Sequence, residues 1–170
     1  MAVGEASWPV MHPISGVRLG VAQAGVKYAG RNDLLVIAIE EGASVAGVFT
    51  QSAFAAAPVL IGREHIANGD IRYLVVNSGN ANACTGERGM NDARATCRAV
   101  AELTDVKPHQ VIPFSTGVIG EYLPIEKIIA AIPQAIASGL EDNWALAGRT
   151  IMTTDTRPKG ASVQFEFDGE

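Results

Sequence analysis

Two hydrophobic spacings alternate along this chain and limit the folds that it can adopt. Short apolar runs at 34–39, 72–77 and 110–114 are typical of buried β-strands. Apolar residues within 91–101 and 124–132 instead recur at the spacing of a helix with one buried face. Strands that alternate with helices predict an α/β (α+β) layered domain, in which helices flank a sheet.

Further strands are expected on either side of these elements. Residues 44–50 predict a strand that pairs with the first apolar run through a short connection at 40–43. Residues 162–167 alternate between apolar and polar side chains, as a half-buried strand does. Asp168-Gly169 then predicts a hairpin turn, and the sequence ends at Glu170, so we expect the partner strand to lie outside it.

The chain divides into a short lead-in and one domain. Residues 1–15 have no steady period, and residues 16–170 form the predicted domain. With 170 residues, of which 48% are hydrophobic, the chain is long enough for one core. Pro133 is expected to kink the helix that has Pro124 in its first turn, or to begin a new helix. Trp144 to Ile151 predict one more short helix.

Charge and hydropathy exclude two classes of partner. The net charge is −5, from 13 Lys and Arg against 18 Asp and Glu, and no basic stripe is present, so nucleic acid is not an expected partner. The apolar runs are far shorter than the ~20 residues of a membrane-spanning helix. The first residues lack the basic start of a secretory signal, which predicts a cytoplasmic protein.

The cysteines and histidines give no metal-binding pattern. Cys84 and Cys97 form no CxxC pair, and the three histidines are scattered singly, so no metal is expected. Cys97 lies on the apolar face of its predicted helix and is expected in the core. Cys84 has no basic neighbour in the sequence to generate a thiolate, so we expect a packed thiol rather than a nucleophile.

A glycine-containing segment at 113–120 follows a predicted strand. Its two glycines would let backbone N–H groups face an anion or an oxyanion without a side chain in the way. Neither GxxxxGK followed by Ser or Thr nor GxGxxG is present, which disfavours a nucleotide-binding loop. From these residues alone, an anion site and a plain glycine turn both stay open.

Two polar segments have structural as well as functional interpretations. Residues 77–86 place three Asn, a Ser and a Thr between a strand and a helix, where such side chains satisfy turn backbones. Residues 153–156, Thr-Thr-Asp-Thr, follow a predicted helix, and the residues alone favour a helix end with satisfied hydroxyls.

Three long segments resemble the glutamate N-acetyltransferases, also called ornithine acetyltransferases. They are NSGNANACTG at 77–86, STGVIGE at 115–121 and IMTTDT at 151–156, and GVFTQSAFAAAPV at 47–59 and LPIEKI at 123–128 are similar to the family as well. The resemblance runs in order from Gly16 to about Gly160 and therefore covers nearly the whole chain.

This resemblance implies an enzyme of arginine biosynthesis that moves an acetyl group from N-acetylornithine to glutamate. Some members also accept acetyl-CoA as donor, and no resident cofactor is implied. The implied fold is a sandwich of mixed sheets and outer helices. In the family a precursor cleaves itself before a Thr, which becomes the nucleophile of a β chain and carries the acetyl group. The present chain resembles the α chain of an α2β2 heterotetramer, whose sandwich the β chain completes.

The resemblance also assigns roles to particular residues. Thr116, through its hydroxyl, and Gly117, through its backbone N–H, match the oxyanion hole, and Thr153 matches a substrate contact, with Thr154 beside it. The family's Ala-Thr cleavage junction has no counterpart here, since Lys159 to Ser162 only superficially resembles it. We therefore expect the junction and the nucleophile beyond Glu170. Two alternatives are a related self-processing hydrolase and a non-catalytic module that binds an anion or an amino acid.

Overall fold

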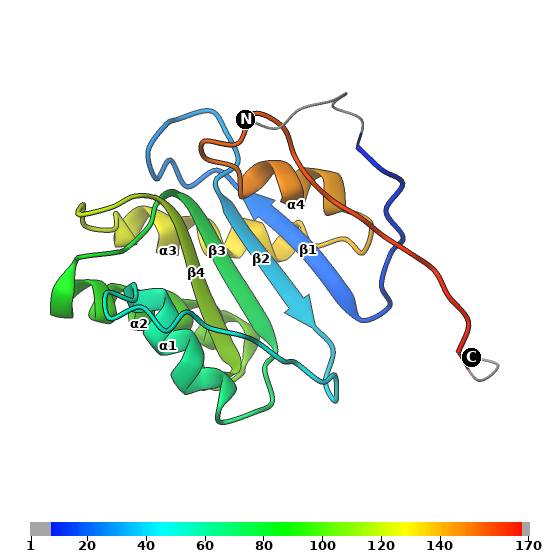
Figure 1. Cartoon of the computed structure of the whole chain (residues 1–170), viewed down its shortest axis with the longest axis horizontal. Helices are drawn as coiled ribbons and strands as arrows, with labels where there is room; N and C mark the ends of the chain where they lie inside the picture. The colour runs from blue at the N-terminus through cyan, green and yellow to red at the C-terminus, as the bar shows by residue number, and fades with distance from the viewer. Residues whose placement is uncertain (1–7, 168–170) are drawn as a thin grey trace.

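A four-stranded mixed sheet forms the centre of the computed structural model, which describes residues 8–167. Its strands lie side by side in chain order, as Figure 1 shows. The first two pairings are antiparallel and the third is parallel. The strands are β1 (Val17–Ala22), β2 (Leu34–Ile39), β3 (Tyr73–Asn80) and β4 (Val111–Val118).

Within the described residues, four α-helices cover the two faces of this sheet unequally. Three of them share the larger core with the strands, whereas α4 packs on the opposite face, over β1 and β2 (Figure 1). The helices are α1 (Ala57–Ile66), α2 (Gly86–Thr104), α3 (Ile125–Ala137) and α4 (Trp144–Thr150), with a short 3₁₀ helix at Pro108–Gln110. The prediction of an α/β domain with helices outside a mixed sheet is confirmed. None of the helices within residues 8–167 has the length and apolar character needed to span a bilayer.

The larger core confirms two of the helices predicted from hydrophobic spacing. Cys97 and Val100 of α2 are fully buried, as are Ile128 and Ile132 of α3. The sequence expectation that Cys97 is a core residue is therefore confirmed.

Helix α3 does not end at Pro133 but continues to Ala137. Its last turns lie directly against β1, where a Cβ on Gly20 would come within 1.8 Å of the Ala135 carbonyl oxygen. Proline removes one helical hydrogen bond, but the apolar face of this helix is buried on both sides of Pro133. Tertiary packing therefore continues a helix that local propensity would end.

The predicted strand at 44–50 is wrong, because these residues form neither a strand nor a hairpin with β2. Both edges of β2 are already paired, one with β1 and the other with β3. The partner on the first edge, β1, was not predicted, because Arg18 and Gly20 interrupt its apolar run. Helix α1 was not predicted either, although Pro58 lies in its first turn, where proline is favoured.

The alternating segment at 162–167 is not a strand in the described chain. Val163, Phe165 and Phe167 are 77%, 79% and 76% exposed, so the prediction of a half-buried strand is wrong for this structure. A strand needs a hydrogen-bonded neighbour, and no described strand pairs with this segment. The predicted turn at Asp168-Gly169 lies outside the described residues, and the division into a lead-in and a domain stays a prediction.

Candidate active site

A cavity of about 540 Å³ lies at the end of β3 and β4, within the size range of small-molecule sites. Its walls come from the β1–β2 loop, the ends of these two strands and the segment after α4. The lining residues are Lys27, Tyr28, Arg31, Asp33, Ser78, Gly79, Thr116, Gly117, Val118, Thr153 and Thr154. All three residues to which the sequence assigned roles therefore line one cavity.

Strand β4 extends through Thr116 and Gly117. These two residues are therefore paired strand residues, and not part of the plain glycine turn that was one of the two interpretations left open. Gly117 is opposite Gly79 in the parallel ladder and has a φ of 138°. A Cβ at Gly117 would lie 2.3 Å from the Gly79 carbonyl carbon, so only glycine fits here. Within residues 8–167 the Thr116 hydroxyl has no hydrogen-bond partner and is thus free to donate to a ligand.

A buried amide joins the two strands directly beside this position. The Ser115 hydroxyl donates to Asn77 Oδ1 over 2.6 Å, and Asn77 Nδ2 donates to the Asn80 carbonyl oxygen over 2.8 Å. Asn77 is only 5% exposed, so its hydrogen bonds form away from solvent. This linkage fixes the end of β4 that carries Thr116 and Gly117.

Asn80 performs a second structural task, because it holds the loop that follows β4. Its Nδ2 lies 3.2 Å from the carbonyl oxygens of both Glu121 and Tyr122, and its Oδ1 accepts from the Asn82 N–H over 2.7 Å. The Asn-rich segment thus satisfies backbone groups by short hydrogen bonds. This confirms the structural interpretation of residues 77–86, and it also shows that the segment supports the cavity.

Asp33 shapes the loop between β1 and β2. Asp33 is 2% exposed, and its carboxylate accepts hydrogen bonds from the N–H groups of Ala24 and Val26, at 2.7 and 2.6 Å. A weaker bond of 3.3 Å comes from Gly25. Three backbone donors compensate this buried charge and hold the loop against the end of β3.

Two hydrogen bonds place the segment after α4 against the cavity. The Ser78 hydroxyl donates to the Thr150 carbonyl oxygen and Arg31 Nη2 donates to that of Met152, both over 2.6 Å. Thr153 and Thr154 consequently line the cavity, and the Thr153 hydroxyl makes no hydrogen bond to any residue in 8–167. The expectation of satisfied hydroxyls at a simple helix end is therefore wrong for Thr153.

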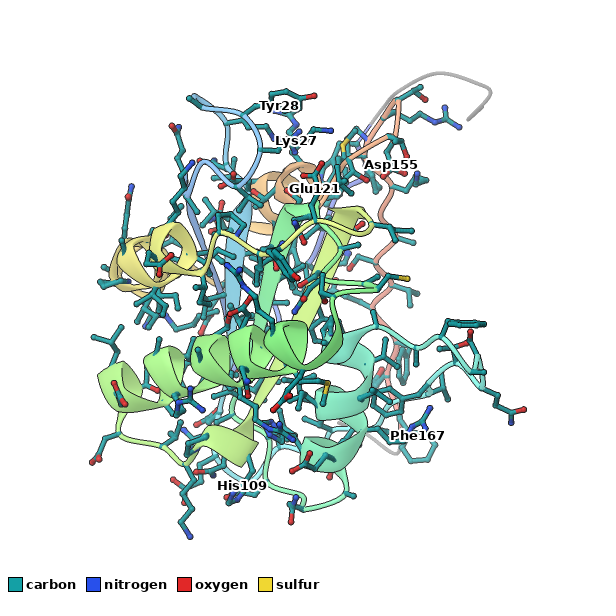
Figure 2. The ribbon with its side chains drawn as sticks, turned by 90° about the vertical axis from the view of Figure 1, so that its left-hand side faces the viewer. Lys27, Tyr28, His109, Glu121, Asp155 and Phe167 are labelled. Atoms are coloured by element: carbon teal, nitrogen blue, oxygen red, sulfur yellow. The ribbon has the colours of Figure 1, made fainter. Side chains whose placement is uncertain are left out.

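The next residue of this segment, Asp155, is engaged elsewhere. A hydrogen bond and the positive charge of Lys159 lower the pKa of the Asp155 carboxyl below its ordinary value of 3.8. In Figure 2, Asp155 lies at the same end of the molecule as Lys27 and Tyr28, opposite His109. Asp155 does not line the cavity that contains Thr116 and Thr153. Its carboxylate pairs with Lys159 instead.

Neither cysteine belongs to the cavity. Burial raises the pKa of the Cys97 thiol to about 12, so this thiol stays protonated at neutral pH. Cys84 is exposed, which corrects the prediction of a packed thiol; it lies in the turn before α2 with a φ of 58° and lines a separate hollow. Among residues 8–167, no three His, Cys, Asp or Glu side chains gather in a way that could hold a metal ion.

The sequence interpretation missed the contribution of the β1–β2 loop. Lys27, Arg31 and Asp33 are charged residues within ten positions of each other, between Gly25 and the apolar run of β2. Charged residues in a glycine-containing loop that leads into a buried strand were the signal available. Their approach to Thr116 depends on the pairing of β1 with β2, which the sequence did not predict.

The chain is similar in sequence to known proteins over almost its whole length. The sequence model of the ArgJ family matches residues 18–170. The chain is 54% identical over 169 residues to the arginine biosynthesis bifunctional protein ArgJ of Pseudomonas syringae pv. tomato, covering 99% of this chain and 42% of that protein. It is 57% identical over 157 residues to the Methylococcus capsulatus protein of the same name, covering 92% of this chain and 38% of that one. The chain thus spans about two fifths of the length of these relatives.

Solved structures show the same fold. The crystal structure of ornithine acetyltransferase from Mycobacterium tuberculosis, complexed with ornithine, is 37% identical with a TM-score of 0.80, over 86% of this chain and 80% of that one. The arginine biosynthesis bifunctional protein ArgJ of Bacillus halodurans is 38% identical with a TM-score of 0.71, over 84% and 74% of the two chains.

Proposed function

This chain belongs to the ArgJ family, and on that premise we propose that it is the α-chain part of an acetyltransferase that moves an acetyl group from N-acetylornithine to glutamate. The observation that carries the proposal is the convergence of Thr116, Gly117 and Thr153 on one cavity. Acetyl-CoA is a further candidate donor. The enzyme belongs to arginine biosynthesis and acts in the cytoplasm.

The proposed chemistry is a two-step acyl transfer. A Thr hydroxyl, supplied by a β chain of the same precursor, attacks the acetyl carbonyl of N-acetylornithine, and the carbonyl oxygen becomes negatively charged. Collapse of this intermediate breaks the C–N bond, releases ornithine with the proton from the hydroxyl, and leaves an acetyl-Thr ester. The amino group of glutamate then attacks the ester by the reverse sequence.

In this proposal the described chain supplies groups that stabilise the oxyanion. The Thr116 hydroxyl has no partner in residues 8–167, and the Gly117 backbone is held against β3 by the close approach to Gly79. Donors that are fixed before reaction favour the tetrahedral intermediate over the planar substrate. Thr153, whose position depends on Arg31 and Ser78, orients the amino-acid substrate.

The division of labour between two chains gives the first test. The 170-residue chain alone should not exchange acetyl groups between N-acetylornithine and labelled glutamate, because it supplies no Thr nucleophile in this proposal. The full-length gene product, which should cleave before that Thr and assemble as α2β2, should catalyse the exchange. Robust turnover by the 170-residue chain would refute the division of labour.

Substitutions in the full-length protein separate the roles of the two threonines. Thr116→Val should lower kcat by about 10²- to 10³-fold with little change in substrate affinity, because the lost donor acts on the oxyanion. Thr153→Val should chiefly raise KM, because it removes binding common to substrate and transition state. Cleavage of each precursor is checked on a gel. A fully processed Thr116→Val enzyme with near-normal kcat would remove Thr116 from the oxyanion hole.

A further inference from the structure

The cavity carries two positive side chains on one wall. Lys27 and Arg31 both come from the β1–β2 loop and both line the cavity, on which Thr116 and Thr153 also lie. The remaining charged lining residue, Asp33, directs its carboxylate to three backbone N–H groups. The described lining therefore presents two cations to a ligand and no carboxylate free to pair with them.

Arg31 is already held in place before any ligand binds. Arg31 is half-buried, and its Nη2 donates to the Met152 carbonyl oxygen over 2.6 Å, which uses one of five N–H donors. The planar group suits a carboxylate, to which it can donate two parallel hydrogen bonds. An anchored guanidinium loses little conformational freedom when it binds an anion.

Lys27 lies on the same side of the cavity, packed against β3 and beside Tyr28. A Cβ on Gly79 would lie 3.0 Å from Lys27 Cβ, which places the loop directly over the end of β3. The Lys27 ammonium lies 5.2 Å from the centroid of the Tyr28 ring. Neither Lys27 nor Arg31 forms an ion pair with any residue in 8–167.

We propose that Lys27 and Arg31 bind the α-carboxylate of the amino-acid substrate. The inference rests on the proposed function, in which N-acetylornithine and glutamate share this group. With the carboxylate at the cationic wall and the acetyl carbonyl at Thr116, one anchor serves both half-reactions. The same anchor discriminates against acetylated amines that lack a carboxylate, because they leave both cations unpaired.

Calorimetric titration of the full-length protein with two ligands tests this assignment. The ligands are N-acetylornithine and its α-carboxamide, which differ in the charge of one group. Hydrogen bonds to a charged group predict that the carboxylate binds about ten- to a hundredfold more tightly than the carboxamide. Lys27→Met and Arg31→Gln should each reduce that ratio toward one by weakening only the carboxylate. Arg149→Gln is the matched control, because Arg149 is exposed on α4 and does not line the cavity, and it should keep the ratio.

The outcomes separate this inference from the proposed function. A variant that weakens both ligands equally, an unmodified protein with a ratio near one, or no measurable binding of either ligand would overturn the assignment. Arg31→Gln also removes the bond to Met152, so Lys27→Met is decisive if the arginine variant does not fold. Acetyl exchange is assayed in the same preparations. If the protein exchanges acetyl groups but binds the carboxylate and the carboxamide equally well, the carboxylate assignment is refuted and the acetyltransferase proposal is not. If the protein prefers the carboxylate but exchanges no acetyl groups, the acetyltransferase proposal is refuted and the carboxylate assignment is not.

Discussion

Replacing Gly117 by Ala tests whether the close approach of β3 and β4 builds the candidate oxyanion site. The new Cβ would lie 2.3 Å from the Gly79 carbonyl carbon and 2.6 Å from the Asn80 nitrogen. Both contacts are with backbone, which cannot rotate away as a flexible side chain can. The strands must therefore separate, or the end of β4 must shift.

The magnitude follows from two costs. An Ala at positive φ costs about 1–2 kcal/mol, and overpacking at a tightly packed site typically adds about 1–3 kcal/mol. Gly117→Ala should therefore lower the free energy of unfolding by about 2–5 kcal/mol. Gly120 provides the matched control, because its φ is also positive, at 81°, but a Cβ there would meet no atom within 4 Å. Gly120→Ala should therefore lower the free energy of unfolding only by the cost of the positive φ, about 1–2 kcal/mol.

Thermal unfolding of the two variants and the unmodified chain, followed by circular dichroism, measures the difference. For a chain of this size, 1 kcal/mol corresponds to about 2–4 °C in Tm. Gly117→Ala should thus unfold about 2–12 °C below Gly120→Ala. Equal losses of Tm in the two variants would show that the contact with Gly79 does not constrain this position, and the account of the Gly117 site would fail.

Three further predictions concern other parts of the chain. A thiol reagent should label Cys84 in the folded chain and leave Cys97 unlabelled until unfolding, because Cys97 is buried and its pKa is raised to about 12; rapid labelling of both would contradict this. Cys97→Ala should cost about 1 kcal/mol of stability and Cys84→Ala less than about 0.5 kcal/mol, with turnover per folded molecule unchanged in the full-length enzyme. Burial raises the pKa of the Asp92 carboxyl above its ordinary value of 3.8, and the positive charge of Arg88 opposes this shift only in part. Because the pKa is raised, the folded chain binds this proton more tightly than the unfolded chain does. The stability that this carboxyl contributes is therefore fully present below pH 3.8 and is lost as the pH rises from 3.8 to the pKa of the folded chain. Denaturant titrations at several pH values in that window should show a smaller loss of stability with rising pH for Asp92→Asn than for the unmodified chain. An equal fall in both proteins would exclude Asp92 as the source.

Hydrophobic period alone identified the elements whose apolar face is continuous. Strands β2, β3 and the start of β4, and helices α2, α3 and α4, were predicted in this way, as was the burial of Cys97. Strand β1 was missed because Arg18 and Gly20 interrupt its pattern, although Arg18 donates to the Gly139 carbonyl oxygen and Gly20 receives α3 at close range. The roles of Arg18 and Gly20 are therefore visible only in the contact of β1 with α3 and the residues after it, which lie more than a hundred positions away in the chain.

For the candidate site too, the sequence determined some features and only the tertiary structure decided the others. Long motifs determined that Thr116, Gly117 and Thr153 belong together, because their residue types and order resemble one family. Only the tertiary structure decided what surrounds them, because the pairing of β1 with β2 brings the charged loop over β3, and hydrogen bonds from Ser78 and Arg31 hold the segment after α4 against it. The two hydrogen bonds join residues more than seventy positions apart, and no local sequence pattern records such distances.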